Sequence, residues 1–145
     1  MRFGSAPVLA LLGVLLLSAC GGDKSTGITG DATGSYNLTT VDGSSLPFTY
    51  FSDDTTTARV TGGNFTLSAD GSFSQTLNYD ATISGQTAIT AITCQGTYTH
   101  SGGTYTFAEV ATGDVSCGST YDGSWNGSNT FLFSLGGHAF VYVKS

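Results

Sequence analysis

Apolar and polar residues alternate with a period of two along most of the chain. The alternating stretches are residues 36–40, 65–69, 73–83, 92–98, 105–107, 121–125 and 131–135. Successive side chains point to opposite faces of a β-strand, so this period predicts strands with one buried face. No stretch after residue 20 has the period of an amphipathic helix. The pattern therefore predicts an all-β domain.

Short segments rich in Gly, Asp and Asn separate these runs and predict hairpin turns. Asp42-Gly43 and Asp70-Gly71 suit the positive φ angles of tight two-residue turns. Further turns are expected at residues 101–103, 126–129 and 136–137. Asp122-Gly123 lies within a run instead, and we interpret it as a β-bulge.

The alternating stretches and the turns between them predict eight or nine strands joined by hairpins, with no crossover helix between them. Such a meander is antiparallel, and its outer strands must be protected from pairing with other chains. We expect the domain, residues 34–145, to close into a barrel of about eight strands. A two-sheet β-sandwich is the alternative.

The first nineteen residues have the features of an export signal. Arg2 is basic, residues 7–17 are apolar, and Ser18-Ala19 supplies small side chains. The apolar run is too short to span a bilayer as a helix. We therefore assign residues 1–19 to a signal peptide and residues 20–33 to Cys20 and a flexible tether.

Leu17-Ser18-Ala19-Cys20 followed by Gly21 resembles the lipobox of bacterial lipoproteins. The resemblance implies diacylglycerol on Cys20, cleavage just before it, and acylation of the new amino terminus, for example with palmitate. Two or more acyl chains anchor a protein stably, so we expect attachment to a membrane of the cell envelope. In lipoproteins of enteric-type bacteria, Asp after the modified cysteine resembles a signal for retention in the inner membrane, so Gly21 at this position favours the outer membrane. The alternative is an ordinary signal peptide with a chance Cys20.

The charge balance narrows the classes of partner. Only Lys24, Arg59 and Lys144 are basic after Cys20, and the whole chain carries a formal charge of −6. Nucleic-acid binding needs clustered basic residues, which this chain lacks. The expected partners are the membrane, through the lipid on Cys20, and either a small hydrophobic ligand or an envelope protein.

Two cysteines remain after Cys20. In an exported chain the environment is oxidising, and the even pair Cys94 and Cys117 predicts a disulfide. Closing a loop of this length stabilises a fold by about 3 kcal/mol. The alternative is two buried free thiols.

The two ends of the domain resemble those of lipocalin-like proteins. In lipocalins a Gly-x-Trp motif opens the barrel and a late basic residue packs over the Trp. Here Gly34-Ser35-Tyr36 opens the domain and Lys144 follows the last strand run, so Tyr36 replaces the Trp. Residues 67–73 and 96–99 also resemble segments of small bacterial lipocalin-like lipoproteins. The resemblance covers residues 34–145 and implies a barrel, without naming a ligand.

Six aromatic residues are the candidate ligand-binding residues, because we expect them to share the inner face. They are Tyr79, Tyr98, Tyr105, Phe107, Tyr121 and Trp125. Rings with polar tips can line an amphipathic pocket. The alternative is that these rings fill the barrel, since eight strands enclose a space that side chains can pack.

No set of catalytic residues can be assembled from the sequence. His100 and His138 lie beside Gly-Gly turns, where solvated histidines are common, and Asp53-Asp54 would point to opposite strand faces. Glu109 continues the face of Tyr105 and Phe107, so it could anchor a ligand or lie in water at the barrel mouth. No metal-binding spacing occurs, so we expect no metal, no cofactor and no enzyme activity.

These observations predict a lipid-anchored, lipocalin-like envelope protein that binds a small apolar or amphipathic molecule. The alternative is a non-enzymatic structural or protein-interaction module of the envelope. A lysozyme inhibitor is a special case of that alternative, because an acidic domain would suit a basic lysozyme.

Overall fold

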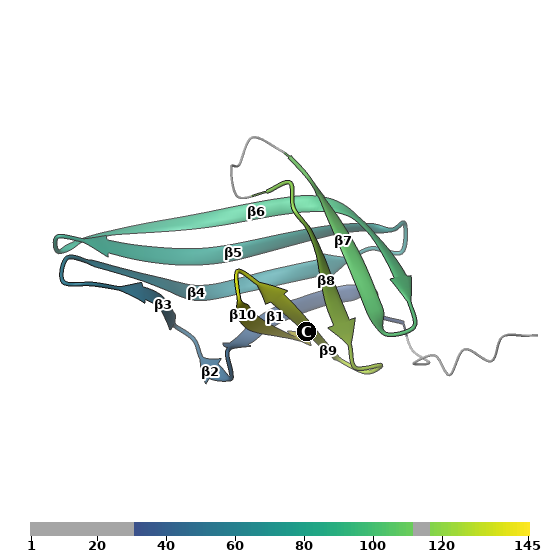
Figure 1. Ribbon diagram of the computed structural model, residues 1–145. Helices are drawn as coiled ribbons and strands as arrows, with labels where there is room; N and C mark the ends of the chain where they lie inside the picture. The colour runs from purple at the N-terminus through teal and green to yellow at the C-terminus, as the bar shows by residue number, and fades with distance from the viewer. Residues whose placement is uncertain (1–30, 112–116) are drawn as a thin grey trace, which may run out of the picture.

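The computed structural model describes residues 31–111 and 117–145, and their regular structure consists of strands (Figure 1). The strands are β1 (Gly34–Val41), β2 (Ser44–Ser45), β3 (Phe48–Ser52), β4 (Thr56–Leu67), β5 (Ser72–Ile83), β6 (Gln86–Ser101), β7 (Thr104–Val110), β8 (Thr120–Trp125), β9 (Thr130–Leu135) and β10 (His138–Lys144). The predicted signal peptide and Cys20 lie outside the described residues. In the described part, no helix has the length and hydrophobicity needed to cross a bilayer.

The strands form one antiparallel sheet that closes on itself. Along the sheet the order is β2-β1-β10-β9-β8-β7-β6-β5-β4-β3, and β1 also pairs with β4. The pairing of β1 with β4 closes the sheet into a barrel of eight strands, which are β1 and the seven strands from β4 through β10. Strands β2 and β3 lie outside this barrel. The prediction of a small antiparallel barrel is confirmed.

Two tight turns show how the sequence sets the hairpins. Asp42 and Gly43 have φ values of 51° and 76° and connect β1 to β2, as the Asp-Gly pair predicted. Ser84 and Gly85, with φ values of 50° and 81°, connect β5 to β6 in the same way. Positive φ at both central residues is typical of the turn that matches strand twist. The sequence analysis did not identify this second turn.

Aromatic side chains fill one end of the barrel, which we call the closed end. Phe65 is fully buried, and its ring contacts six other aromatic rings with centroids 5.0–6.2 Å away. Those neighbours are Tyr36, Phe73, Phe107, Phe131, Phe133 and Tyr142. Rings at these distances make mostly edge-to-face or tilted contacts, which stabilise aromatic cores. At this end the barrel is packed, as one of the two alternatives predicted.

The β-bulge that we expected at Asp122-Gly123 is not present in the structure. The pairing of β8 with β7 and with β9 runs through Gly123 without a register shift. A Cβ at this position would lie 2.7 Å from Cε1 of Phe133 and 3.1 Å from Cε2 of Phe107. The glycine therefore makes room for two core rings, and the strand needs no extra residue.

The closed end also holds the two ends of the described domain together. Lys144 places its Nζ 5.8 Å from the ring centroid of Tyr36, the contact that the lipocalin resemblance implied. Gly34 has a φ of 131°, and a Cβ there would lie 2.8 Å from Cε of Lys144. Ala32, which we assigned to the tether, is buried in the core and accepts a hydrogen bond from the Tyr36 hydroxyl through its carbonyl.

Strands β4, β5 and β6 extend past the closed barrel at the other end. β1 pairs only with residues 64–67 of β4, and β7 pairs only with residues 95–101 of β6. The remaining parts form a projecting ribbon with β3 along its edge (Figure 1). We call this ribbon the overhang: β3 together with residues 56–63, 77–83 and 86–93. Its inner face continues the inner face of the barrel.

Candidate functional site

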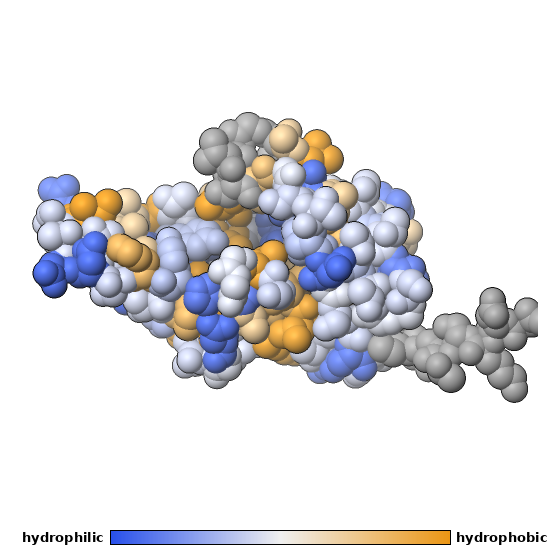
Figure 2. Space-filling view, in the orientation of Figure 1, coloured by the Kyte–Doolittle hydropathy of each residue, from blue (hydrophilic) through white to orange (hydrophobic). Residues whose placement is uncertain are grey.

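A pocket with a volume of about 570 Å³ lies where the overhang meets the open end of the barrel, and we call it the mouth pocket. Its lining residues are Phe48, Tyr50, Val60, Leu77, Tyr79, Ala81, Thr90, Ile92, Leu135, Gly136, His138 and Phe140. Apolar side chains dominate this wall, and Figure 2 shows apolar surface exposed in the middle of the molecule between polar margins. The volume and composition are typical of small-molecule sites.

Strand alternation places these residues on one face. Tyr79 of β5 lies opposite Thr90 of β6, and Leu77 lies opposite Ile92. Directly opposite residues of an antiparallel pair share a face of the sheet. Inside the barrel that face is covered by the opposite strands, whereas at the overhang the described residues cover it only in part, through Leu135, Gly136, His138 and Phe140. The same pattern that builds the core therefore leaves a partly covered apolar face here.

A second pocket of about 240 Å³ adjoins the mouth pocket on the barrel side. The two pockets share Leu77, Tyr79, Ile92, Leu135 and Gly136. The remaining lining residues of the second pocket are Gln75, Cys94, Glu109, Ser119 and Tyr121. This set is more polar than the wall of the mouth pocket, so we call the second pocket the polar recess. Together they form an apolar opening with a polar inner end.

Gln75 is the buried polar side chain at the base of the recess, only 4% exposed. Its Nε2 donates to the Tyr142 hydroxyl at 2.9 Å, and its Oε1 accepts from the Tyr121 hydroxyl at 2.9 Å. Burial raises the pKa of both tyrosines, and the nearby Glu109 carboxylate raises that of Tyr121 further. Both hydroxyls therefore stay neutral, and the amide stays fixed between them.

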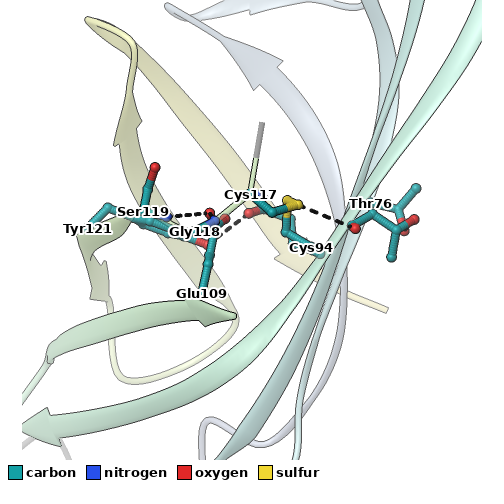
Figure 3. Close-up of a disulfide and its surroundings, with 9 residues drawn as sticks. Thr76, Cys94, Glu109, Cys117, Gly118, Ser119 and Tyr121 are labelled. Carbon is teal, nitrogen blue, oxygen red and sulfur yellow. Dashed lines mark hydrogen bonds between the residues drawn. A yellow bond between two sulfur atoms is a disulfide. The ribbon is translucent and has the colours of Figure 1, made fainter. Parts of the chain in front are cut away.

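Glu109 lines the recess from β7 and is held by backbone groups (Figure 3). Its Oε2 accepts hydrogen bonds from the backbone N–H groups of Gly118 and Ser119, each at 3.1 Å. Beside it Cys94 and Cys117 form the predicted disulfide, which ties β6 to the segment that precedes β8. The carboxylate is thus positioned at the pocket wall.

The side chains of Asp42 and His138 contact each other at the rim of the mouth pocket. Oδ2 of Asp42 lies 2.6 Å from Nδ1 of His138, and Oδ1 accepts from the backbone N–H of Ala139 at 2.8 Å. Two hydrogen bonds lower the pKa of Asp42: the one from the Ala139 backbone has the larger effect, and the one with His138 has the smaller. The His138 ring also meets Phe48 edge to face, with centroids 5.4 Å apart. These contacts fix the β1–β2 turn against β10.

The structure does not bring the six candidate aromatic residues into one site. Tyr79 lines both pockets, and Tyr121 lines the polar recess. Phe107 and Trp125 are buried in the packed core. Tyr98 and Tyr105 lie at the closed end, beside a hollow of about 100 Å³ next to residues 31–33.

Most lining residues of the mouth pocket were not identified from the sequence. Leu77, Ile92 and Val60 are ordinary strand residues whose pattern matches that of core positions. The signal that could have found them is strand length, because β4 and β5 have 12 residues and β6 has 16. Strands that are longer than their neighbours must project from the barrel.

The described residues show no cluster of side chains that is typical of a metal site. Within residues 31–111 and 117–145, no three His, Cys, Asp or Glu side chains converge. His100 stacks on Tyr105 with centroids 5.0 Å apart, whereas His138 belongs to the rim of the mouth pocket.

No protein-family model and no curated protein sequence matches the chain. The barrel and its two adjoining pockets are therefore the observations on which a function can be based.

Proposed function

We propose that the protein is a lipid-anchored envelope lipoprotein that binds a small amphipathic molecule in the mouth pocket and polar recess. The observation that carries this proposal is the junction of an apolar pocket of about 570 Å³ with a polar recess of about 240 Å³. An amphipathic molecule has the same arrangement, with an apolar body and one polar end.

The apolar body of the ligand would lie against Val60, Leu77 and Ile92. Each methylene group removed from water there contributes about 0.8 kcal/mol. The polar end would reach the recess, where Tyr121 and Glu109 offer hydrogen-bonding groups. Because both side chains are already held in place, little ordering is needed when the ligand binds.

The charges near the pockets favour a neutral or cationic polar end. No Lys or Arg is among the described residues that line either pocket. Arg59 is paired with Asp80, and Lys144 contacts Tyr36 at the closed end. An anionic group would therefore meet the Glu109 carboxylate without a compensating cation, which is costly in a partly desolvated site. An amine or a hydroxyl group could instead donate a hydrogen bond to Glu109.

The direction of the pocket fits attachment through the amino terminus. β1 begins at the closed end, and the overhang projects from the opposite end (Figure 1). If Cys20 carries the lipid, the attachment point lies at the end of the domain opposite the mouth pocket and leaves that pocket accessible. A ligand could then enter from the aqueous side or be handed over by another envelope component.

Native mass spectrometry tests this proposal directly. The chain from Gly21 onward, without Cys20, is purified from a bacterial periplasm and measured under native and denaturing conditions. We expect an added mass that is lost on denaturation and belongs to a neutral or cationic amphiphile. A bare protein that also binds no added long-chain amine or alcohol would overturn the proposal.

A further inference from the structure

Strand β6 has a long free edge. On one side it pairs with β5 from Gln86 to Thr97, but on the other side β7 pairs only with residues 95–101. Among the described residues, nothing pairs with residues 86–93 on that second side. Figure 1 shows this part of β6 as the outermost strand of the overhang.

The turn between β5 and β6 determines which backbone groups this edge presents. Ile83 and Gln86 flank a two-residue turn, so they form a hydrogen-bonded pair. Hydrogen-bonded and non-bonded pairs then alternate along the strand. The N–H and C=O groups of Thr87, Ile89 and Ala91 consequently point away from β5, toward the free edge.

This edge lacks the features that usually prevent pairing between chains. Residues 86–93 read Gln-Thr-Ala-Ile-Thr-Ala-Ile-Thr, without a charge or a proline, and their pairing with β5 contains no bulge. Exposed edge strands are normally guarded by one of these features. Ile89, near the centre of the stretch, is 82% exposed, the largest value among the exposed large hydrophobic residues described. Asp80, opposite Ile89, is paired with Arg59.

We infer that residues 86–92 pair antiparallel with the same residues of a second copy of the chain. With a two-fold axis at Ile89, that residue faces its own counterpart and Thr87 faces Ala91 of the second copy. This register joins outward-pointing backbone groups to one another, as an antiparallel ladder requires. It also packs the two exposed Ile89 side chains against each other, and no like charges meet because the stretch is uncharged.

The pairing would leave the mouth pocket usable. Thr90 and Ile92 line that pocket from the inner face of β6, whereas Ile89 lies on the outer face. A continuous sheet across the two-fold axis would place both mouth pockets on the same side. The dimer does not depend on a bound ligand, so its test is independent of the proposed function.

The test uses the chain from Gly21, without Cys20, which keeps every strand of the barrel. Sedimentation analysis should give the mass of a dimer for the wild type and of a monomer for Ile89→Lys, where two ammonium groups would face each other. Leu132→Lys adds the same charge at another exposed strand position and should remain a dimer. A monomeric wild type, or a dimer that persists in Ile89→Lys, would overturn the inference.

The register has its own readout that needs no disruptive change. Ile89→Cys should form a disulfide between the two copies under oxidising conditions, because residue 89 lies opposite its counterpart at the Cα spacing that a disulfide requires. Thr87→Cys should not, because its neighbour across the interface is Ala91. Equal cross-linking at both positions would contradict the proposed two-fold axis.

Discussion

The rings of Tyr50 and Tyr79 meet edge to face at the mouth pocket, with centroids 5.9 Å apart and planes at 79°. Tyr50 belongs to β3, the edge strand of the overhang, and Tyr79 belongs to β5. We expect Tyr50→Ala to weaken binding of N-phenyl-1-naphthylamine, a neutral dye, by about threefold to tenfold. This range follows because an aromatic contact, such as one between the Tyr50 ring and the dye, contributes about 0.5–1.5 kcal/mol to the binding free energy. Fluorescence titration measures the change.

Phe51 provides the matched control for this prediction. It is the next residue on β3 and is 48% exposed, similar to Tyr50 at 46%, but it does not line the pocket. Phe51→Ala should leave dye binding unchanged. Equal losses in the two variants would mean that the dye binds to the exposed edge of β3 and not in the pocket.

The polar end of the ligand can be examined through Glu109. A long-chain amine should bind more tightly than a fatty acid of the same length, because the carboxylate at the recess attracts the first and repels the second. Glu109→Gln removes the charge and should reduce this preference, while binding of a long-chain alcohol changes less. Competition against the dye provides the measurement. A stronger affinity for the fatty acid in the wild type would argue against the orientation proposed above.

Phe65 should be among the most sensitive positions of the core. Its ring is fully buried and contacts six other rings, so Phe65→Ala leaves a cavity that rigid neighbours cannot fill. We expect the free energy of unfolding to fall by about 3–5 kcal/mol. Urea denaturation followed by tryptophan fluorescence gives this value. A loss as small as that of the exposed Phe51→Ala would show that the closed end is loosely packed.

At Gly123 we expect the addition of a methyl group to destabilise the fold, whereas at Phe65 the removal of a side chain does so. Gly123→Ala places a Cβ 2.7 Å from Cε1 of Phe133 and should destabilise the fold by overpacking, by about 1–3 kcal/mol. Ser124→Ala, at the neighbouring outward-facing position, should have little effect. A neutral Gly123→Ala would mean that the ring of Phe133 can move aside.

The pair of Arg59 and Asp80 predicts a pH-dependent contribution to stability. Arg59 donates from Nε at 2.8 Å and from Nη2 at 2.5 Å, and these hydrogen bonds lower the pKa of Asp80. The contribution is therefore complete above the unfolded-state pKa of about 4 and is lost as the pH falls through the lower folded-state pKa. Asp80→Asn should destabilise the fold at neutral pH, and its difference from the wild type should shrink in acid. Urea unfolding at several pH values tests this, and a difference independent of pH would contradict it.

The barrel could be predicted from the sequence because its signals are local. The alternation around Tyr36 and Phe65 and the turn at Asp42-Gly43 each need only a few neighbouring residues. The disulfide between Cys94 and Cys117 followed from the expected oxidising environment and is confirmed. The predictions about residues 1–30, including lipid on Cys20, remain predictions, because these residues lie outside the described part.

The pocket could not be predicted because it depends on which strands pair and for how long. Tyr79 and Phe107 have the same inward-facing pattern, yet one lines a pocket and the other is buried in the core. The difference arises because β1 pairs with only residues 64–67 of β4, and β7 with only residues 95–101 of β6. The tight turn at Ser84-Gly85, which was missed, extends the β5–β6 hairpin past the barrel.

The most direct test of ligand binding in the mouth pocket compares two lysine substitutions. One lies on the inner face of a strand, inside the pocket, and the other lies on the exposed outer face of another strand. Ile92→Lys introduces an ammonium group into the apolar wall, whereas Leu132→Lys adds the same charge on the outside of β9. Titration with N-phenyl-1-naphthylamine should show binding to the wild type and to Leu132→Lys. Ile92→Lys should bind at least about tenfold more weakly, equivalent to about 1.4 kcal/mol. Equal affinity in all three proteins, or no binding to the wild type, would contradict the account.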